Sequence, residues 1–316
     1  MARIRIVVCL ALCVGGVAAG DAGWSKSPGN PVLGGKLGAC GDACVLQEKD
    51  TFRMWFSWRP KKSIALVESK DGIRWDEPQI VLGPNEDTDW EANVSRPAVY
   101  KRPYHYHLWY TGQAQGRSWI GQALSPEGKT WTRERAAPAL SADMAWEKTA
   151  VTYPRVQWEP TGTVFRMWYS GGEQAAPDAI GYATSAEGNM WTKHEDNPVF
   201  TADQKLPWEK HGVRAGQVLR RGGWHFMFYV GCSDAGHPQI GLARSGDGIR
   251  GWQRHPANPI ISPTTNGWDH DGCYEPFAVF DETANRWLLW YNGRKGDVEQ
   301  IGLATRHGED LGFPDK

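Results

Sequence analysis

A single pattern recurs along most of this chain, and it limits the fold more than any other feature of the sequence. Each copy holds an aromatic-rich triplet, then an Ile-containing strand, then a Ser-x-acid-Gly turn closed by Trp, and then a Trp-acid pair. The triplets are residues 54–56, 108–110, 167–169, 227–229 and 289–291. The turns are residues 69–75, 125–131, 185–191 and 245–252. A period of this length is typical of repeat architectures in which each copy forms one supersecondary unit.

The local chemistry of each copy predicts β-strands. Four short runs of aromatic or β-branched residues are separated by Gly, Asp, Asn and Pro, and none has a sustained helical period. Residues 165–170 and 179–184 are one such pair, and the turn at 186–188 closes it on Trp191. Four antiparallel strands in every copy predict an all-β protein, a β-propeller with one blade per copy.

The two ends of the chain indicate how the ring closes. The aromatic triplet occurs five times, but the last copy lacks its turn and closing Trp. The missing piece stands at the other end, where Trp24 precedes Asn30-Pro31 by the same spacing as Trp191 precedes Asn197-Pro198. We therefore expect a five-bladed β-propeller over residues 21–316, with the N-terminal strand as the outermost strand of the last blade. Such closure hides sheet edges that would otherwise be exposed.

The first twenty residues resemble a secretory signal peptide. Arg3 and Arg5 precede an apolar run over residues 6–17, and Ala18, Ala19 and Gly20 follow it. We expect residues 1–20 to be removed and the mature protein to be secreted or periplasmic. No second apolar stretch has membrane length, and the net charge is −1. These features argue against nucleic-acid and membrane partners, and we expect a monomer.

Four cysteines remain after the predicted processing: Cys40, Cys44, Cys232 and Cys273. An even number in an exported protein allows disulfides in three full pairings, and buried thiols are the alternative. Cys40 and Cys44 have neither the spacing nor the partner histidines of a zinc site, so no metal is assigned. We expect no cofactor, with a structural Ca²⁺ in the channel kept open as an alternative.

The innermost strands of a propeller line its channel, and the repeat places one polar position at the start of each. That position is occupied by Asp42, by Arg96, by Tyr153, by Arg214 or Ala215, and by Glu275. The following prolines, Pro97, Pro154 and Pro276, are explained by the repeat itself. The differing polar side chains are not. Repeated structural positions keep similar residues, so this divergence indicates a functional site.

These motifs together resemble the five-bladed glycoside hydrolases, the superfamily that includes families 32, 43, 62, 68, 117 and 130. The resemblance rests on the aromatic triplets followed by small residues, the Ile-Gly-Tyr-Ala-Thr-Ser strand at 180–185 and the Asn-Pro strands, and it covers the mature chain. It implies acidic residues at the channel mouth. Asp42 matches the base or nucleophile on the first inner strand, and Glu275 is the candidate for the general acid. Arg96 and Tyr153 stand where the family pattern would offer a further Asp.

Glycosidic cleavage needs this pair because one carboxyl must protonate the leaving oxygen while another attacks the sugar or activates water. We expect Arg96, Tyr153, Arg214, His211, Asp271 and Trp58 to bind substrate, with Trp55 and Trp119 as further aromatic candidates. The repeated Trp-acid pairs, which include Asp269, are expected to be structural. The leading hypothesis is a secreted glycoside hydrolase acting on a poly- or oligosaccharide. The alternatives are a carbohydrate-binding propeller without catalysis and a glycoside phosphorylase.

Overall fold

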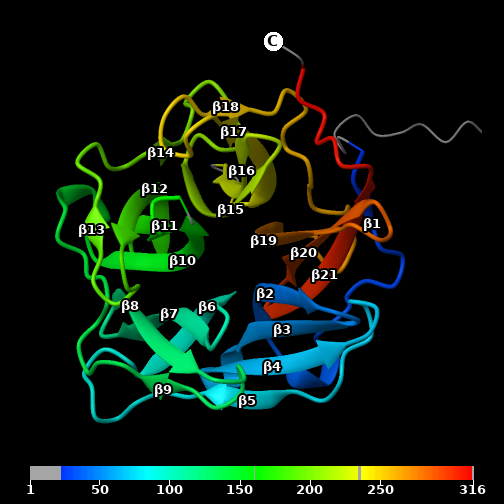
Figure 1. Ribbon diagram of the computed structural model, residues 1–316. Coiled ribbons are helices and arrows are strands. Elements are labelled where there is room, and N and C mark those ends of the chain that lie inside the picture. The colour runs from blue at the N-terminus through cyan, green and yellow to red at the C-terminus, as the bar shows by residue number, and fades with distance from the viewer. Residues whose placement is uncertain (1–22, 160, 234–235, 315–316) are drawn as a thin grey trace, which may run out of the picture.

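The computed structural model describes residues 23–159, 161–233 and 236–314, so the predicted signal peptide lies outside it. Strands dominate, and the helical elements of the described residues are the short 3-10 turns η1 (Gly35–Leu37), η2 (Arg59–Lys61) and η3 (Ala145–Glu147). No helix in these ranges is long and apolar enough to cross a membrane. The strands form antiparallel units around a common centre, and a parallel contact between Ser118 and Ala150 joins two neighbouring units into one larger sheet. The chain is therefore an all-β β-propeller (Figure 1).

Each unit runs from the centre outwards in chain order. The first is β2 (Cys40–Glu48), β3 (Thr51–Trp58), β4 (Ser63–Ser69) and β5 (Gln79–Leu82). The next is β6 (Asn93–Lys101), β7 (Tyr106–Ala114), β8 (Arg117–Ser125) and β9 (Thr132–Arg133). Then come β10 (Ala150–Glu159), β11 (Val164–Glu173), β12 (Ala176–Ser185) and β13 (Thr192–Lys193), with β14 (Phe200–Thr201) also on β12. They are followed by β15 (Gly212–Arg221), β16 (Trp224–Cys232), β17 (Gln239–Ser245) and β18 (Gln253–Arg254).

The last unit joins the two ends of the chain, as the sequence predicts. It consists of β19 (Gly272–Asp281), β20 (Arg286–Lys295), β21 (Val298–His307) and, outermost, β1 (Ser25–Lys26). Ser25 pairs with Thr305 and Lys26 with Ala304 in antiparallel register. The side chain of Asn30 accepts a hydrogen bond from the N–H of Leu303, a contact that Asn197 and Asn258 repeat in their own units. The N-terminal strand therefore takes the structural place that its matching motif indicates.

Each repeated Trp-acid pair anchors the unit that it precedes. The Trp90 ring lies so close over the sheet that a Cβ on Gly112 or Gly121 would come within 2.4 Å and 2.6 Å of it, which explains the repeated glycines. The neighbouring Glu91 is fully buried, accepts a hydrogen bond from the Tyr110 hydroxyl at 2.6 Å and pairs with Arg133 at 2.7 Å. We call Glu91 and its equivalents the wall carboxylates: Glu91, Glu147, Glu209 and Asp269. The contacts of each wall carboxylate lie within a single unit. These carboxylates therefore have the expected structural role, but they stabilise one blade and do not link two.

Neighbouring units are held together through the Ser-x-acid-Gly turns. In each turn the Ser hydroxyl accepts a hydrogen bond from the N–H of the Gly three residues on, at 2.9 Å for Ser69 and Gly72. The carbonyl oxygen of Gly72 accepts a hydrogen bond of 3.0 Å from the indole N–H of Trp290, which belongs to the adjacent unit. Trp55, Trp109 and Trp168 make the same contact to Gly128, Gly188 and Gly248. Burying one such ring contributes roughly 4–6 kcal/mol of hydrophobic free energy, so these tryptophans hold blade to blade.

Candidate active site

The innermost strands share one backbone irregularity at their starting ends. Each pairing with the second strand of its unit is interrupted by a bulge: Gly41/Cys44, Ser95/Ala98, Thr152/Arg155, Arg214/Gln217 and Tyr274/Phe277. Within these bulges a positive φ occurs at Asp42 (59°), Arg96 (55°), Tyr153 (53°) and Glu275 (52°). A non-glycine residue in this region costs about 1–3 kcal/mol and is held by its surroundings. The register also assigns the equivalent position in the fourth unit to residue 215, with Arg214 one residue earlier.

Hydrogen bonds between neighbouring units hold three of these bulges. The N–H of Asp42 donates to Asn292 at 2.8 Å, that of Arg96 to Ser57 at 2.7 Å, and that of Tyr153 to Thr111 at 3.2 Å. The acceptors occupy the same place, directly after the aromatic triplet of the preceding unit. A bulge aims its side chain away from the direction that regular pairing would give. The small polar residue after each triplet therefore fixes the side chains that the next unit presents at the centre.

Asp42 is a fully buried carboxylate with a complete set of partners. Arg59 pairs with it at 2.9 Å, and the Ser57 hydroxyl donates to it at 2.6 Å. Burial alone would raise the pKa of Asp42, but the positive charges of Arg59 and Arg96 and the Ser57 hydrogen bond outweigh burial and lower it. Asp42 is therefore ionised at neutral pH.

Glu275 is equally buried, but its surroundings have the opposite effect. Neither carboxyl oxygen has a hydrogen-bond partner among the described residues, and Arg214 Nε lies 3.6 Å from Oε1. Burial raises the pKa of Glu275 to about 7, opposed by Arg214 and reinforced by the negative charge of Asp42. Two carboxyls whose environments move their pKa values apart are the usual arrangement of an acid and a base.

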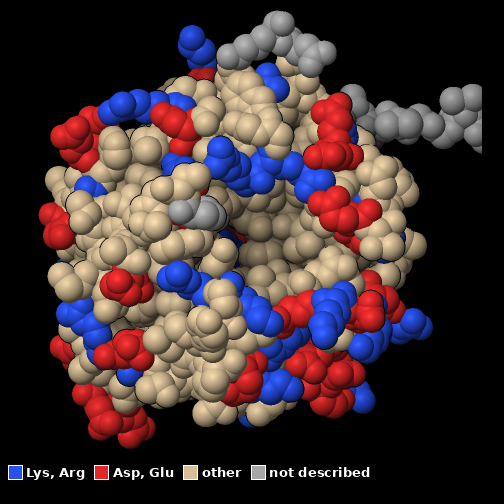
Figure 2. Space-filling view, in the orientation of Figure 1, with Lys and Arg blue, Asp and Glu red and all other residues tan. Residues whose placement is uncertain are grey.

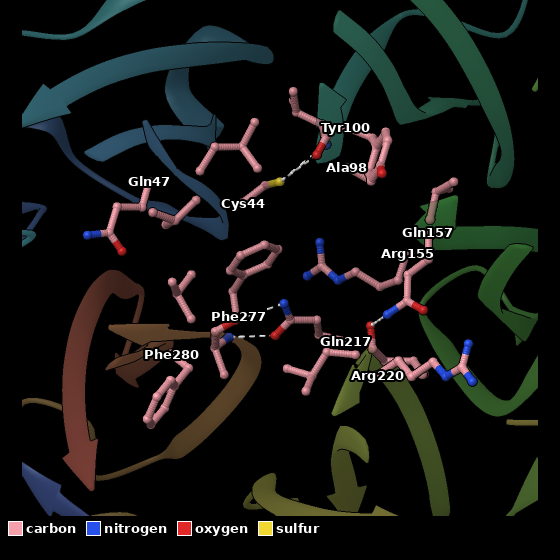
Figure 3. Close-up of a pocket in the computed structure, with 18 of the residues that line it drawn as sticks. Cys44, Gln47, Ala98, Tyr100, Arg155, Gln157, Gln217, Arg220, Phe277 and Phe280 are labelled. Carbon is pink, nitrogen blue, oxygen red and sulfur yellow. Dashed lines mark hydrogen bonds between the residues drawn. The ribbon is translucent and has the colours of Figure 1, made fainter. Parts of the chain in front are cut away.

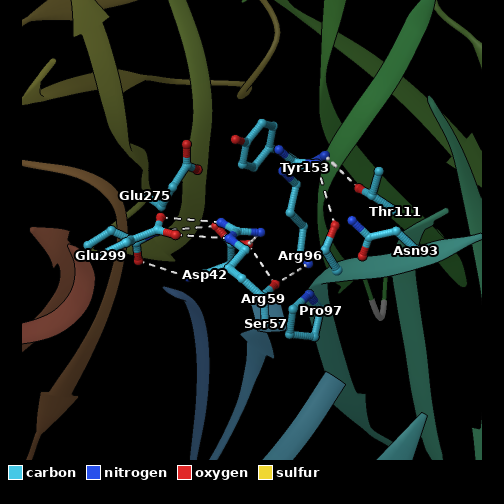
Figure 4. Close-up of polar contacts among 12 residues, drawn as sticks. Asp42, Ser57, Arg59, Asn93, Arg96, Pro97, Thr111, Tyr153, Glu275 and Glu299 are labelled. Atoms are coloured by element: carbon cyan, nitrogen blue, oxygen red, sulfur yellow. Dashed lines mark hydrogen bonds and ion pairs between the residues drawn. The ribbon is translucent and has the colours of Figure 1, made fainter. Parts of the chain in front are cut away.

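Arg96 and Tyr153 complete the centre. The Arg96 guanidinium lies over the Tyr153 ring, 4.1 Å from its centroid. Its positive charge contributes to the low pKa of Asp42 and partly offsets the rise that burial causes in the pKa of Glu275. Burial raises the pKa of Tyr153 to about 12, so its phenol stays neutral. Figure 4 shows Asp42, Glu275, Arg96 and Tyr153 gathered from separate inner strands. The structure thus brings together the divergent positions singled out in the sequence.

Arg59 and Glu299 are central residues that the sequence reasoning missed. Arg59 joins Asp42 to Glu299, which it contacts at 2.9 Å, and Asn292 donates to both carboxylates. The sequence does indicate that the first unit differs from the others at this point. Where other units have Gly after the small polar residue, the first unit has Trp58 and then Arg59, because no Trp-acid pair precedes it to require a glycine.

A cavity of about 570 Å³ opens beside Glu275 and holds two of the predicted residues. Arg214 and His211 both line it, together with Tyr274, Cys232, Lys148 and Asp178. Lys148 and Asp178 pair with each other at 3.1 Å. Arg214 connects this lining to Glu275, which is not itself part of it. Polar groups of both signs in the lining suit a ligand rich in hydroxyl groups.

The remaining predicted binding residues have local partners. The carboxylate of Asp271 contacts His270 Nδ1 at 2.7 Å and accepts the N–H of Gly296 at 2.7 Å. Trp58 donates its indole N–H to the Leu37 carbonyl at 2.8 Å and leaves part of its ring exposed beside Arg59. Trp119 is half-buried against the core. Trp55 is fully buried, so its expected place in a sugar subsite is wrong, because its ring packs between units.

The four cysteines are free thiols, so the disulfide alternative is not realised. Cys40, Cys44 and Cys273 are buried, and burial raises the pKa of Cys44 to about 11. Such thiols pack as small apolar side chains.

Fold and centre together define a class: β-propellers that present carboxyl groups where their inner strands converge. A family model described as glycosyl hydrolases family 43 matches residues 28–307. The chain therefore belongs to glycosyl hydrolases family 43. No curated protein matches the chain.

Solved structures share the fold at low sequence identity. A glycosyl hydrolase from Bacteroides ovatus superposes with a TM-score of 0.74 at 16% identity, covering 94% of this chain and 96% of the other. A putative glycosidase from Bacteroides thetaiotaomicron gives 0.73 at 12% identity, covering 92% and 98%. A third structure, titled as showing that the GH130 family of mannoside phosphorylases contains glycoside hydrolases, gives 0.71 at 16% identity, covering 95% and 97%.

Proposed function

We propose that this protein hydrolyses glycosidic bonds of a poly- or oligosaccharide, with Glu275 as general acid and Asp42 as base or nucleophile. The observation that carries the proposal is the contrast between two fully buried central carboxyls: Arg59 and Arg96 keep the pKa of Asp42 low, and burial raises that of Glu275 to about 7. Membership of glycosyl hydrolases family 43 supports the same reaction class.

In this mechanism Glu275 donates its proton to the leaving glycosidic oxygen. Neither of its oxygens has a hydrogen-bond partner among the described residues, so a substrate oxygen that enters this buried centre can take that place. As the bond breaks, Asp42 either removes a proton from the attacking water or attacks the anomeric carbon itself. In the second case water, deprotonated by Glu275, then breaks the glycosyl ester on Asp42 and releases the sugar. Arg59 and Ser57 hold the orientation of Asp42. Arg96 stabilises the negative charge that passes between the two carboxyls.

The cavity beside Glu275 gives the substrate its place. Arg214 and His211 face it and supply hydrogen-bond donors for sugar hydroxyls. Tyr153 and the exposed part of Trp58 would contact sugar faces. The predicted roles of these residues, and of Asp271 at the edge, belong to this proposal. A secreted or periplasmic monomer with no resident cofactor is the form in which we expect the enzyme to act.

The test is a screen of the purified protein on aryl glycosides and on plant, algal and microbial polysaccharides. We expect turnover of at least one substrate, and loss of that turnover in both Asp42→Asn and Glu275→Gln. A protein that binds a polysaccharide but cleaves none would favour the non-catalytic alternative. Full activity in both variants would remove the assigned roles.

A phosphorylase is the second candidate, because Arg96 and Arg214 each have a buried Nε without a hydrogen-bond partner. Such donors suit a phosphate oxygen. Turnover that requires inorganic phosphate and releases a sugar phosphate would favour this candidate. Turnover at an unchanged rate without phosphate would exclude it.

A further inference from the structure

A second cavity lies at the other end of the inner strands, away from Asp42 and Glu275. Its volume is about 470 Å³, and its lining comes from the later halves of the inner strands, such as residues 44–47, 155–157 and 277–280. Figure 2 shows the molecule hollowed at the middle of the ring, and Figure 3 shows this cavity between the units. The proposed reaction does not use it.

The charges around this cavity are uneven. Three arginines, Arg155, Arg220 and Arg221, line it, and no acidic side chain does. Arg220 pairs with Glu159 at 3.4 Å, and Arg221 pairs with Glu282 at 2.9 Å, so these two charges are balanced. Among the described residues no carboxylate lies within ion-pair distance of Arg155. Arg155 is therefore the one arginine of this lining that has no ion pair among the described residues.

Arg155 is buried, with 4% of its surface exposed, and only part of its guanidinium is bonded. Nη1 donates to the Pro97 carbonyl at 3.2 Å, while Nε and Nη2 have no hydrogen-bond partner in the described part of the chain. Figure 3 shows the side chain projecting into the cavity. A buried charge without partners is costly, and a guanidinium cannot relieve that cost by losing its proton.

The free nitrogens are a matched pair. Nε–H and Nη2–H form one edge of the planar guanidinium, the edge that binds two oxygens of a single oxyanion. The lining combines apolar side chains, such as Val99 and Phe277, with three glutamines, and the Phe277 ring centroid lies 5.7 Å from the guanidinium carbon of Arg155. Apolar walls favour an anion with an apolar body over the strongly hydrated phosphate or sulfate ions.

We propose that this end of the channel is a binding site for a small carboxylate, held through both oxygens by Nε and Nη2 of Arg155. Gln217 bridges two inner strands beside it, donating to the Ala278 carbonyl at 2.9 Å and accepting the Ala278 N–H. Gln217 thereby fixes one wall, whereas Nε and Nη2 of Arg155 each expose less than 1 Å², so the ligand reaches them when the side chain turns towards the cavity. The site is separate from the proposed catalytic centre.

The experiment is isothermal titration of the whole protein with sodium benzoate, and separately with sodium sulfate, at constant ionic strength. We expect benzoate to bind and Arg155→Gln to weaken its binding about tenfold to a hundredfold, since a charged hydrogen-bonding partner is lost. The matched control is Arg214→Gln, which removes a guanidinium from the other end of the channel and should leave the affinity unchanged. Activity is not the readout, because Arg155 also lowers the pKa of Glu275.

Arg155→Lys keeps the charge but not the paired donors, and it should bind benzoate more weakly than the wild type; it also serves if Arg155→Gln does not fold. The proposal is overturned if benzoate does not bind the wild type, if its affinity survives Arg155→Gln and Arg155→Lys, or if Arg214→Gln abolishes it. Binding of sulfate in place of benzoate would overturn the carboxylate class.

Discussion

Glu275 is buried to the same degree as the wall carboxylates, yet its surroundings differ from theirs. Glu209 accepts hydrogen bonds from the Tyr229 hydroxyl at 2.6 Å and from the N–H of Asp203, and it pairs with Arg254 at 2.7 Å. Neither oxygen of Glu275 accepts a hydrogen bond from any residue that the structure describes. The first arrangement repeats from unit to unit and the second occurs at a position where the residues differ. A buried carboxylate that recurs in each unit with its hydrogen-bond partners indicates a structural role. A buried carboxyl at a position where the residues differ, without such partners, indicates a chemical role.

The largest effect is expected from Asp42→Asn, which would break the central pair at its ionised member. The amide can neither attack nor accept a proton, so kcat should fall about 10²–10⁴-fold on every substrate. Steady-state kinetics on the substrate found by the screen measures it. A loss of less than tenfold would show that another group does this work.

Glu275→Gln should affect substrates unequally. Turnover of a sugar with a poor leaving group should fall about 10²–10⁴-fold, since Gln cannot donate the proton. An aryl glycoside whose phenol leaves without protonation should lose much less. Comparing kcat for the two leaving groups measures the difference, and equal losses would contradict the role of general acid.

The pH dependence follows from the same residue. Only protonated Glu275 can act as acid, so kcat/KM should be high below a pKa of about 7 and fall tenfold per pH unit well above it. Burial also makes the folded pKa higher than the ordinary value of 4.5, so the stabilisation present below that value is lost as pH rises through about 7. Glu275→Gln should remove this loss of stability, measured by urea unfolding at several pH values. An unchanged dependence would contradict the raised pKa.

Glu209→Gln makes the same chemical change at a wall carboxylate. It should lower stability and leave activity unchanged, which is the reverse of the effect expected for Glu275→Gln. We expect a loss of about 1–3 kcal/mol in the free energy of unfolding, because the Tyr229 hydroxyl and Arg254 lose a charged partner. Urea unfolding measures this loss, and kcat of the folded protein should stay unchanged. A fall in kcat without destabilisation would erase the distinction between wall and centre.

The smallest effect is expected where the ring closes. Lys26 of the N-terminal strand contacts Asp269 at 2.5 Å and the Ser262 carbonyl at 2.6 Å, and the Tyr291 hydroxyl still donates to Asp269 without it. Lys26→Met should therefore lower stability by about 1 kcal/mol. Thermal unfolding measures the change, and kcat should not move. An unaltered Tm would show that strand pairing alone closes the ring.

The sequence by itself determined the strand content, the repeat and the closure, because these depend on local turn chemistry and on motifs present several times. It also singled out Asp42, Arg96, Tyr153 and Glu275, since their side chains differ at a position where the repeat predicts similarity. The family resemblance then supplied a reaction for them.

Only the tertiary structure decided how these residues are charged and what else joins them. Arg59 pairs with Asp42 of its own unit and also with Glu299 of the last unit, and this second link spans a separation that no local pattern reveals. Within the described part of the chain, Glu275 and two nitrogens of Arg155 lack hydrogen-bond partners, and this too is a property of the assembled walls. A pKa or an unmet donor depends on what surrounds a group in space, and the ring brings those neighbours together only when it closes.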